Sequence, residues 1–388
     1  MDPVDLVSID EVVELAKTLI AIPSVSGEEQ GLVDWLENYF QDIGLEDIER
    51  HSVEEAGDTL TGWVRGPEDG ATLMLNFHVD TFNAFEGWET DPFEPVVKNS
   101  RIYGLGAHDM KGGAACLLSA VGALVKSGVE LGGSVLVSAT TDEENWSRGI
   151  HTLIKKGILE DVDYCIVPEQ SSPGTITVGQ LGRHVFHIDF YGKVVHAVFE
   201  GGINAVTDAS RVALEVENIK ELGYMPEYDK QGSICVTGLR GGGSDILVPE
   251  YAELWIDRHI LPNQTAEDAA KQIHEAVKRA KIESRYKLTW DNRPTPAPTS
   301  YITPPDSNLV QTVTKALEGF SGKEVEYIIE TSVADTNHIA VHGKVPTIIL
   351  GPHGGNTCEA NEWVDIASML TVAKTLTGTT IELLNNHE

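Results

Sequence analysis

The sequence is short of positive charge. Lysine and arginine together number 28, against 60 aspartate and glutamate residues, which leaves a formal net charge of −32. Such a charge repels polyanions at long range, so we expect no nucleic-acid partner and no anionic membrane partner. Because net charge bears on solubility and association rather than on fold, the acidic excess indicates no function by itself.

Long apolar runs and paired cysteines are also missing. No segment reaches the roughly 18 consecutive apolar residues that span a bilayer. Residues 1–19 carry acids where a secretion signal has a basic region, and their apolar residues recur at helical spacing. The cysteines are scattered without CxxC pairing, at Cys116, Cys165, Cys235 and Cys358. We therefore expect a cytoplasmic protein with reduced thiols.

Helical and strand patterns alternate through the first part of the chain. Apolar residues at helical spacing predict helices over 11–20, 30–43 and 112–127. Short apolar runs predict strands over 71–77, 134–139 and 164–167. This alternation is typical of an α/β sheet domain.

The pattern changes after about residue 176. Strands are predicted over 183–191, 233–239 and 252–260, and helices over 204–222 and 267–282. Prolines make 293–299 a predicted linker, after which a helix at 308–320 and a strand at 345–350 resemble the first part again. We expect residues 1–176 and 294–388 to form one catalytic domain, with 177–293 as a small domain inserted into it.

Acidic residues and histidines follow several of the predicted strands. They occur as His78-Val-Asp80, His108-Asp109, Asp142-Glu143-Glu144, Pro168-Glu169 and the segment 351–362. In α/β folds, sites form where the strands end. Since alternate strand residues share a face, His78 and Asp80 point the same way, and a carboxylate so placed suits orienting a ligand imidazole.

The adjacent pair Glu143 and Glu144 fits a division of roles. A hydrolytic metal site needs one carboxylate as a ligand and a free one to take a proton from water. Taken singly, such a pair is more often solvated surface charge. The joint occurrence of these motifs is what indicates a metal site.

The motifs HVD, GLGAHDMKGG, TDEE, VPEQS, GKVVH and GPHGG with NEWV resemble a family of co-catalytic metallohydrolases. That family includes aminoacylase, acetylornithine deacetylase, succinyl-diaminopimelate desuccinylase and glutamate carboxypeptidase. The motifs run in family order from His78 to Trp363 and so cover most of the chain. The resemblance implies an α/β fold in which a mixed-sheet catalytic domain of the phosphorylase/hydrolase type carries an inserted ferredoxin-like α+β lid. It also implies a homodimer formed through that lid.

The resemblance further implies one or two divalent metal ions per chain, with zinc, manganese and cobalt as the candidates. His78 and Glu169 would bind one ion, Asp109 would bridge both, and Glu144 would bind the second. Where the family has its last ligand histidine, four residues before the Glu of the Asn-Glu motif, this sequence has Cys358. A thiolate is a strong zinc ligand, so Cys358 is a candidate to complete the second site. His353 is the alternative ligand, and a weak or empty second site is the third reading.

Other roles follow from the same resemblance. Glu143 would be the general base, and Asp80 would hold the His78 ring. His196 would reach the site of a neighbouring subunit and steady the oxyanion, although a strand-end histidine packed at the lid surface is the simpler reading. Arg258 would bind a substrate carboxylate, or it could pair with Asp257 or its neighbours.

The predicted function is a metal-dependent hydrolase that uses metal-activated water to cleave an amide (C–N) bond. Its substrate would be a small carboxylate-bearing molecule such as an N-acyl amino acid or a dipeptide. The first alternative is a mononuclear aminohydrolase that deaminates an unusual, aromatic amine with a single metal at His78, Asp109 and Glu169. An indole and a guanidinium in 145–148 favour a planar or anionic substrate, with ordinary loop packing as the other reading. The second is a non-catalytic binding protein on the same fold, against which the retained Glu143 argues.

Overall fold

A computed structural model describes residues 2–386, which divide into two compact units. The larger unit is built from the chain up to Gly179, from Ile302–Ile328 and from Ala334 onward. The smaller unit comprises Gln180–Tyr301 and Ile329–Val333. The division thus falls at Gln180 and Tyr301, compared with 177 and 293 from the sequence, and the proline-rich segment 293–299 lies inside the smaller unit.

A nine-stranded sheet forms the centre of the larger unit, in the order β1-β2-β6-β3-β7-β17-β8-β15, with β16 paired to β8. Its strands are β1 (Glu46–His51), β2 (Thr59–Val64), β3 (Thr72–His78), β6 (Ser134–Thr140), β7 (Tyr164–Val167), β8 (Thr175–Gln180), β15 (Tyr301–Ile302), β16 (Glu326–Glu330) and β17 (Thr347–Ile349). The central strands β6, β3, β7 and β17 are parallel, whereas β2 runs antiparallel to β6 and β17 antiparallel to β8. The sheet is mixed, and the predicted α/β class is confirmed.

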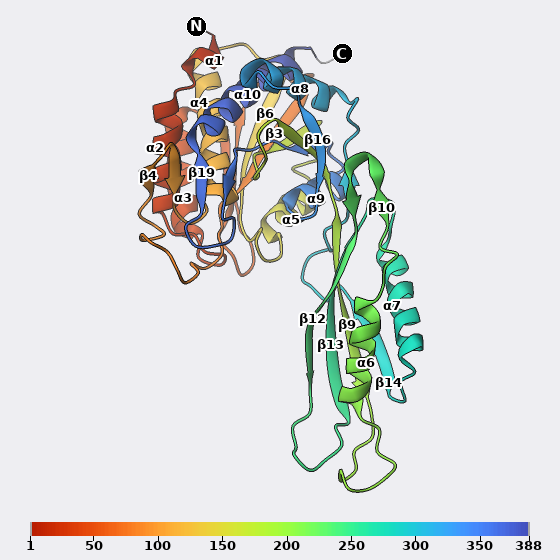
Figure 1. Ribbon diagram of the computed structural model, residues 1–388. Coiled ribbons are helices and arrows are strands. Elements are labelled where there is room, and N and C mark those ends of the chain that lie inside the picture. Colours follow the sequence, from red (N-terminus) through yellow and green to blue (C-terminus); the bar gives the residue numbers. More distant parts are fainter. Residues whose placement is uncertain (1, 387–388) are drawn as a thin grey trace. The chain divides into compact units, whose positions relative to one another are not determined.

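Helices cover this sheet (Figure 1). They are α1 (Pro3–Leu6), α2 (Ile9–Ala21), α3 (Gln30–Ile43), α4 (Gly112–Ser127), α5 (Arg148–Lys155), α8 (Asn308–Ser321), α9 (Asp335–Val341) and α10 (Ile366–Asn385). Helices α4 and α10 pack on β3, with α2 and α8 against them, while α5 and α9 contact each other. Within the described residues, none of the helices has the length and apolar character of a membrane span.

A small second sheet links two distant parts of the larger unit. It contains β4 (Val96–Lys98), β5 (Arg101–Tyr103), β18 (Gly354–Gly355) and β19 (Trp363–Asp365), in the order β18-β19-β5-β4. Strand β19 pairs antiparallel with β5. The short turn η1 (Ala107–Lys111) follows β5 and leads into α4, so the sheet brings the 354–365 segment beside the turn that carries Asp109.

The smaller unit is an α+β layer structure. Its antiparallel sheet has the order β12-β13-β9-β14, formed by β9 (Gly182–Tyr191), β12 (Ser233–Gly241), β13 (Tyr251–Ile260) and β14 (Arg285–Trp290). Helices α6 (Ala205–Glu217) and α7 (Ala266–Ala280) pack on it. Alternate residues of β9, namely Phe186, Ile188 and Phe190, are buried in the core beneath these helices, as the period of a strand requires. Three short elements complete the unit: β10 (Tyr224–Met225), η2 (Pro226–Tyr228) and β11 (Lys230–Gln231).

The first turn of α4 lies against the loop that follows β7. A Cβ atom added to Gly113 would overlap the carbonyl oxygen of Pro168, the residue before Glu169. Gly122, on the same helix, has no atom within 4 Å of such a Cβ. Substitutions at these two glycines therefore distinguish the effect of close packing from the effect of helix propensity.

We expect Gly113→Ala to destabilise the protein by about 1–3 kcal/mol, because the helix must move away from the backbone of the loop. Gly122→Ala is the matched control and should stabilise by about 0.5–1 kcal/mol, since alanine costs less entropy in a helix. Urea unfolding followed by circular dichroism measures both. Equal midpoints for the two variants would contradict the close approach at Gly113.

Candidate metal centre

Parallel strands of the larger sheet deliver acidic residues to one edge. β3 ends at His78, β6 ends just before Glu143 and Glu144, and β7 ends just before Glu169. Because β3 pairs in parallel with both β6 and β7, these ends lie side by side. The sheet therefore assembles residues that are far apart in the sequence.

The imidazole of His78 is buried at the centre of this edge. Its Nε2 lies 3.1 Å from Oδ1 of Asp109 and 3.3 Å from Oε1 of Glu169. Burial acts to lower the pKa of His78, but the charge of Glu169 and hydrogen bonds with Asp109 and Asp80 hold that pKa well above its usual value. Nε2 is thus the ring nitrogen that faces the carboxylates.

Asp80 holds both His78 and the Glu143–Glu144 turn. The main-chain oxygen of Asp80 lies 3.0 Å from Nδ1 of His78, and its carboxylate lies 3.5 Å from the same atom. The backbone N–H groups of Glu143 and Glu144 each donate to this carboxylate at 3.1 Å, and the Ser26 hydroxyl donates to it at 2.7 Å. Asp80 is therefore placed to fix the ring and the glutamate pair together.

Asp109 faces two of the other predicted ligands. Its backbone (φ −119°, ψ 92°) departs from helical geometry inside η1. One carboxylate oxygen contacts His78, and the other, Oδ2, accepts from Sγ of Cys358 at 3.5 Å. A carboxylate with both oxygens directed at different candidate ligands has the arrangement of a bridge.

The donor set fits a divalent metal ion. One ligand atom each from His78, Asp109 and Glu144 lies within 4.8 Å of the others, and imidazole nitrogen and carboxylate oxygen are ligands that zinc, manganese and cobalt accept. Oε2 of Glu169 is buried without a hydrogen-bond partner among the described residues. Burial and neighbouring acids raise the pKa of Glu144 well above its usual range. A cation among these groups would offset their repulsion and satisfy the free oxygen.

Glu143 precedes Glu144 in the chain, and the charges of His78 and Glu169 act on it, but the three converging ligand atoms come from other residues. Burial raises the pKa of Glu143 well above its usual range, while the charge of His78 opposes that rise. A half-buried carboxyl group that takes up a proton readily suits the role of a general base.

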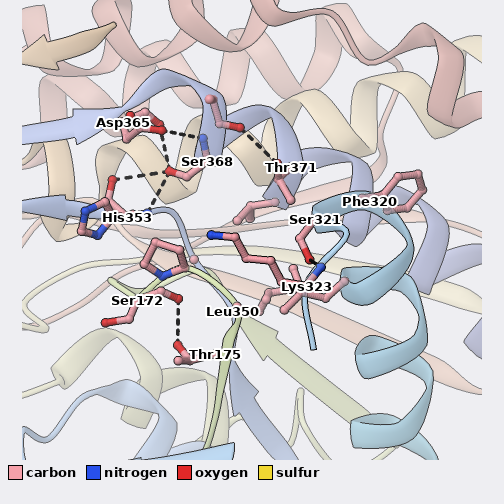
Figure 2. Close-up of a pocket in the computed structure, with 16 residues that line it drawn as sticks. Ser172, Thr175, Phe320, Ser321, Lys323, Leu350, His353, Asp365, Ser368 and Thr371 are labelled. Carbon is pink, nitrogen blue, oxygen red and sulfur yellow. Dashed lines mark hydrogen bonds between the residues drawn. The ribbon is translucent and has the colours of Figure 1, made fainter. Parts of the chain in front are cut away.

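Cys358 and His353 lie on different sides of the 351–358 loop. Cys358 contacts Asp109, as described above. Figure 2 shows His353 at a cavity that none of the other predicted ligands lines. The volume of this cavity is about 380 Å³. The ring of His353 stands edge-on to Trp363 with centroids 5.4 Å apart, and its backbone N–H donates to Ser368 at 2.9 Å. Of the two candidate ligands, the geometry favours Cys358.

His196 belongs to the smaller unit and is exposed there. It forms an isolated bridge with Leu247, and its Nδ1 accepts from the backbone N–H of Val198 at 3.3 Å. Its ring packs edge-on to Phe199, which is 68% exposed. Both rings are thus open to a partner.

Arg258 also lies in the smaller unit, but it is buried, with only 1% of its surface exposed. Its guanidinium donates to the main-chain oxygens of Ser233, His259 and Leu222. Removal from water lowers the pKa of Arg258 to about 10. These contacts satisfy the buried guanidinium without a substrate, so we do not include Arg258 in the proposed site.

Asp335, at the start of α9, is an acid near this site that sequence reasoning missed. Its carboxylate accepts from the hydroxyl of Thr140, the last residue of β6, at 2.7 Å. Burial raises the pKa of Asp335 to about 7, and the charges of His78 and Glu169 also act on it. A lone aspartate in 333–338 carries no motif, and only the fold brings it to the end of β6.

Comparison with protein families decides the class. The model of peptidase family M20/M25/M40 matches residues 74–382, which include every predicted site residue. The chain belongs to this family. The expected enzyme class, a metal-dependent hydrolase of C–N bonds, is thereby confirmed, and family membership argues against the non-catalytic reading.

Two curated relatives share about a quarter of their residues with the chain. A succinyl-diaminopimelate desuccinylase of Nitrosospira multiformis is 26% identical over 386 residues, which span 93% of this chain and 95% of the relative. An N-formyl-4-amino-5-aminomethyl-2-methylpyrimidine deformylase of Bacillus subtilis is 28% identical over 293 residues, or 70% of this chain and 68% of the relative. Both names describe the removal of an acyl group, succinyl in the first and N-formyl in the second.

Solved structures share the fold. The aminopeptidase PepT of Bacillus cereus superposes with a TM-score of 0.82 at 19% identity, covering 97% of this chain and 99% of that one. The YXEP protein of Bacillus subtilis, described as a dinuclear metal-binding peptidase of the M20 family, gives 0.74 at 15% identity, with 98% and 99% covered. These likenesses confirm the expected fold.

We expect Cys358→Ala to weaken metal binding by about tenfold or more, because it removes a side chain in contact with Asp109. His353→Ala should leave metal binding unchanged, since that ring lines the separate cavity. The measurement is a competition with a chelator, with bound metal counted by elemental analysis. Loss of metal from His353→Ala, with Cys358→Ala unaffected, would reverse the assignment.

Proposed function

We propose that the chain removes an acyl group from the nitrogen of a small carboxylate-bearing molecule, such as an N-acyl amino acid or a dipeptide. The observation that carries this proposal is the convergence of His78, Asp109 and Glu144 within 4.8 Å, with Glu143 adjacent in the chain. The named activities of both relatives, a desuccinylase and a deformylase, support cleavage at an acyl–nitrogen bond.

In the proposed site, His78, Asp109, Glu144, Glu169 and Cys358 hold one or two divalent ions, of which zinc, manganese and cobalt are the candidates. When bound, such an ion polarises the scissile carbonyl and makes water a better nucleophile at neutral pH. Asp80 fixes the direction of the His78 ring and of the glutamate pair through the contacts described above.

The remaining steps belong to the protein's own groups. The carboxylate of Glu143 takes the proton from the attacking water as the new C–O bond forms. Glu143 then gives that proton to the nitrogen as the C–N bond breaks, so the amine leaves in neutral form. The same group acts first as base and then as acid, which suits a half-buried carboxyl whose pKa lies above its usual range.

Aromatic residues near the site residues in the sequence favour a planar group in the substrate. Phe82, Phe85 and Trp146 are 38%, 45% and 38% exposed, and they lie within a few residues of Asp80 or Glu144 in the sequence. Exposed aromatic rings stack on flat groups. The substrate panel should therefore include N-formyl aromatic amines beside N-succinyl and N-acetyl amino acids and dipeptides.

We expect Glu143→Gln to lower kcat by about 10²–10⁴-fold on the best substrate of this panel, because the proton acceptor is lost. Metal content should stay at the wild-type level, since the proposal gives Glu143 the role of the base and not that of a ligand. Glu86→Gln, at an exposed glutamate, is the control and should change neither quantity. Near wild-type turnover by Glu143→Gln would remove Glu143 from the chemistry.

The proposal extends to a cytoplasmic homodimer in which His196 acts in the site of the partner subunit. His196 is exposed on the smaller unit beside the exposed ring of Phe199, and this exposure supports a contact with another subunit. In such a dimer each complete site needs Glu143 from one subunit and His196 from the other.

Mixing inactive Glu143→Ala and His196→Ala subunits should therefore restore activity. With free exchange, hybrid dimers hold one intact site each, which gives about a quarter of the wild-type activity per chain in a twofold-symmetric dimer. A mixture of Glu143→Ala with Glu143→Gln is the control and should remain inactive. A role in trans would be contradicted if activity did not recover although mass spectrometry showed subunit exchange. It would also be contradicted if the protein were a fully active monomer by sedimentation.

A further inference from the structure

Glu362 is a buried carboxylate that the proposed chemistry does not use. It is 1% exposed, and its side chain accepts three backbone hydrogen bonds from the turn that presents Asp109. Oε1 accepts from the N–H groups of His108 at 2.7 Å and Asp109 at 2.8 Å, and Oε2 accepts from that of Gly106 at 2.8 Å. All three donors lie within four residues of one loop.

The small sheet brings Glu362 to this loop. Trp363, the next residue, pairs with Tyr103 in the β19–β5 ladder. The ladder continues as the N–H of Gly104 donates to the main-chain oxygen of Glu362 at 3.1 Å. The Glu362 side chain therefore projects into the turn that the chain makes directly after β5.

That turn needs an external support. Gly106 has a φ of +77°, and Asp109 departs from helical geometry, so a regular helix does not satisfy the N–H groups before it. Buried N–H groups without partners are costly, and a carboxylate is the strongest acceptor a side chain can offer them. Glu362 satisfies three at once, including the N–H of Asp109 itself.

We infer that Glu362 is a positioning residue for the metal centre: it holds the 106–109 turn so that the Asp109 carboxylate faces His78 and Cys358. The inference rests on the proposed function in one respect, that Asp109 is a metal ligand. It does not depend on the substrate. Residues that orient a ligand from outside the coordination sphere commonly contribute 10–100-fold to metal affinity.

Charge alone is the rival explanation. A carboxylate near a cation attracts it whether or not it supports a loop, and Glu362 is close enough to Asp109 for their charges to act on each other. Two substitutions separate these effects. Glu362→Gln removes the charge and turns an amide N–H₂ toward a backbone N–H, whereas Glu362→Asp keeps the charge but draws the oxygens back by one methylene.

The test is the binding of cobalt(II) to the full chain after its metals are removed with a chelator. Affinity comes from competition titration, and the visible absorption of bound cobalt reports the geometry of its ligands. We expect both variants to bind about 10–100-fold more weakly than wild type and to give altered cobalt spectra. Glu359→Gln, at an exposed glutamate in the same loop, is the matched control and should match wild type in both measurements.

The outcomes discriminate clearly. The inference would be overturned if Glu362→Asp kept the wild-type cobalt affinity and spectrum and only Glu362→Gln bound weakly. Glu362 would then act through its charge alone. Reduced stability of the metal-free variants, with cobalt affinity and spectrum unchanged, would make the role structural only and would also overturn it. If the wild-type chain takes up no cobalt, zinc or manganese, the proposed function itself fails. That result is distinct from any result obtained with the variants.

A measurement on the unaltered chain covers variants that fail to fold. Hydrogen exchange of metal-free wild-type protein, followed by mass spectrometry of peptides spanning 104–111, reports whether the three N–H groups are bonded. Slow exchange of these three N–H groups would agree with Glu362 holding the turn before any metal binds. Fast exchange in the folded protein would overturn it.

Discussion

Mutual repulsion of buried carboxylates is the constraint on which the site depends. Asp80, Asp109 and Glu169 are buried within a few ångströms of His78, and Glu144 converges on the same point. Bringing such charges out of water is unfavourable unless each finds a partner. The fold supplies partners in fixed directions, as backbone N–H groups for Asp80 and the His78 ring for Asp109 and Glu169. What remains uncompensated, such as Oε2 of Glu169, points to a cation.

The support of the site divides between the two sheets. The large parallel sheet fixes His78, the glutamate pair and Glu169, whose strands are hydrogen-bonded neighbours. The small sheet fixes Asp109 and Cys358, because the turn of Asp109 follows β5 and the turn of Cys358 precedes β19, at the same end of this antiparallel pairing. The contact of Asp109 with His78 joins the two halves. Asp109 therefore couples the residues that the small sheet holds to those that the large sheet holds.

The spacing of apolar residues predicted the helices and strands that bury a single, wholly apolar face. Helix α3 begins and ends as expected because Leu32, Val33, Leu36 and Phe40 form a single apolar stripe and Gly44 (φ +84°) ends it. Helix α10 was missed because its buried face contains threonines. The hydroxyls of Thr375, Thr377 and Thr380 donate to main-chain oxygens four residues earlier. Polar residues therefore occupy core positions, and the apolar residues alone do not show the helical period.

Local pattern alone predicts the candidate site only where strand ends carry it, whereas Asp109 and Cys358 were predicted from the family resemblance. His78, Glu143, Glu144 and Glu169 each follow a strand that the apolar pattern revealed, so their meeting was foreseeable from parallel pairing. Strands β5 and β19 have three residues each and are separated by more than 250 positions, too short and too distant for any local pattern to pair them. Everything that depends on this pairing had to come from the structure, including the choice between Cys358 and His353 and the contacts of Glu362. The part of the site that departs from its family's pattern is also the part that long-range pairing controls.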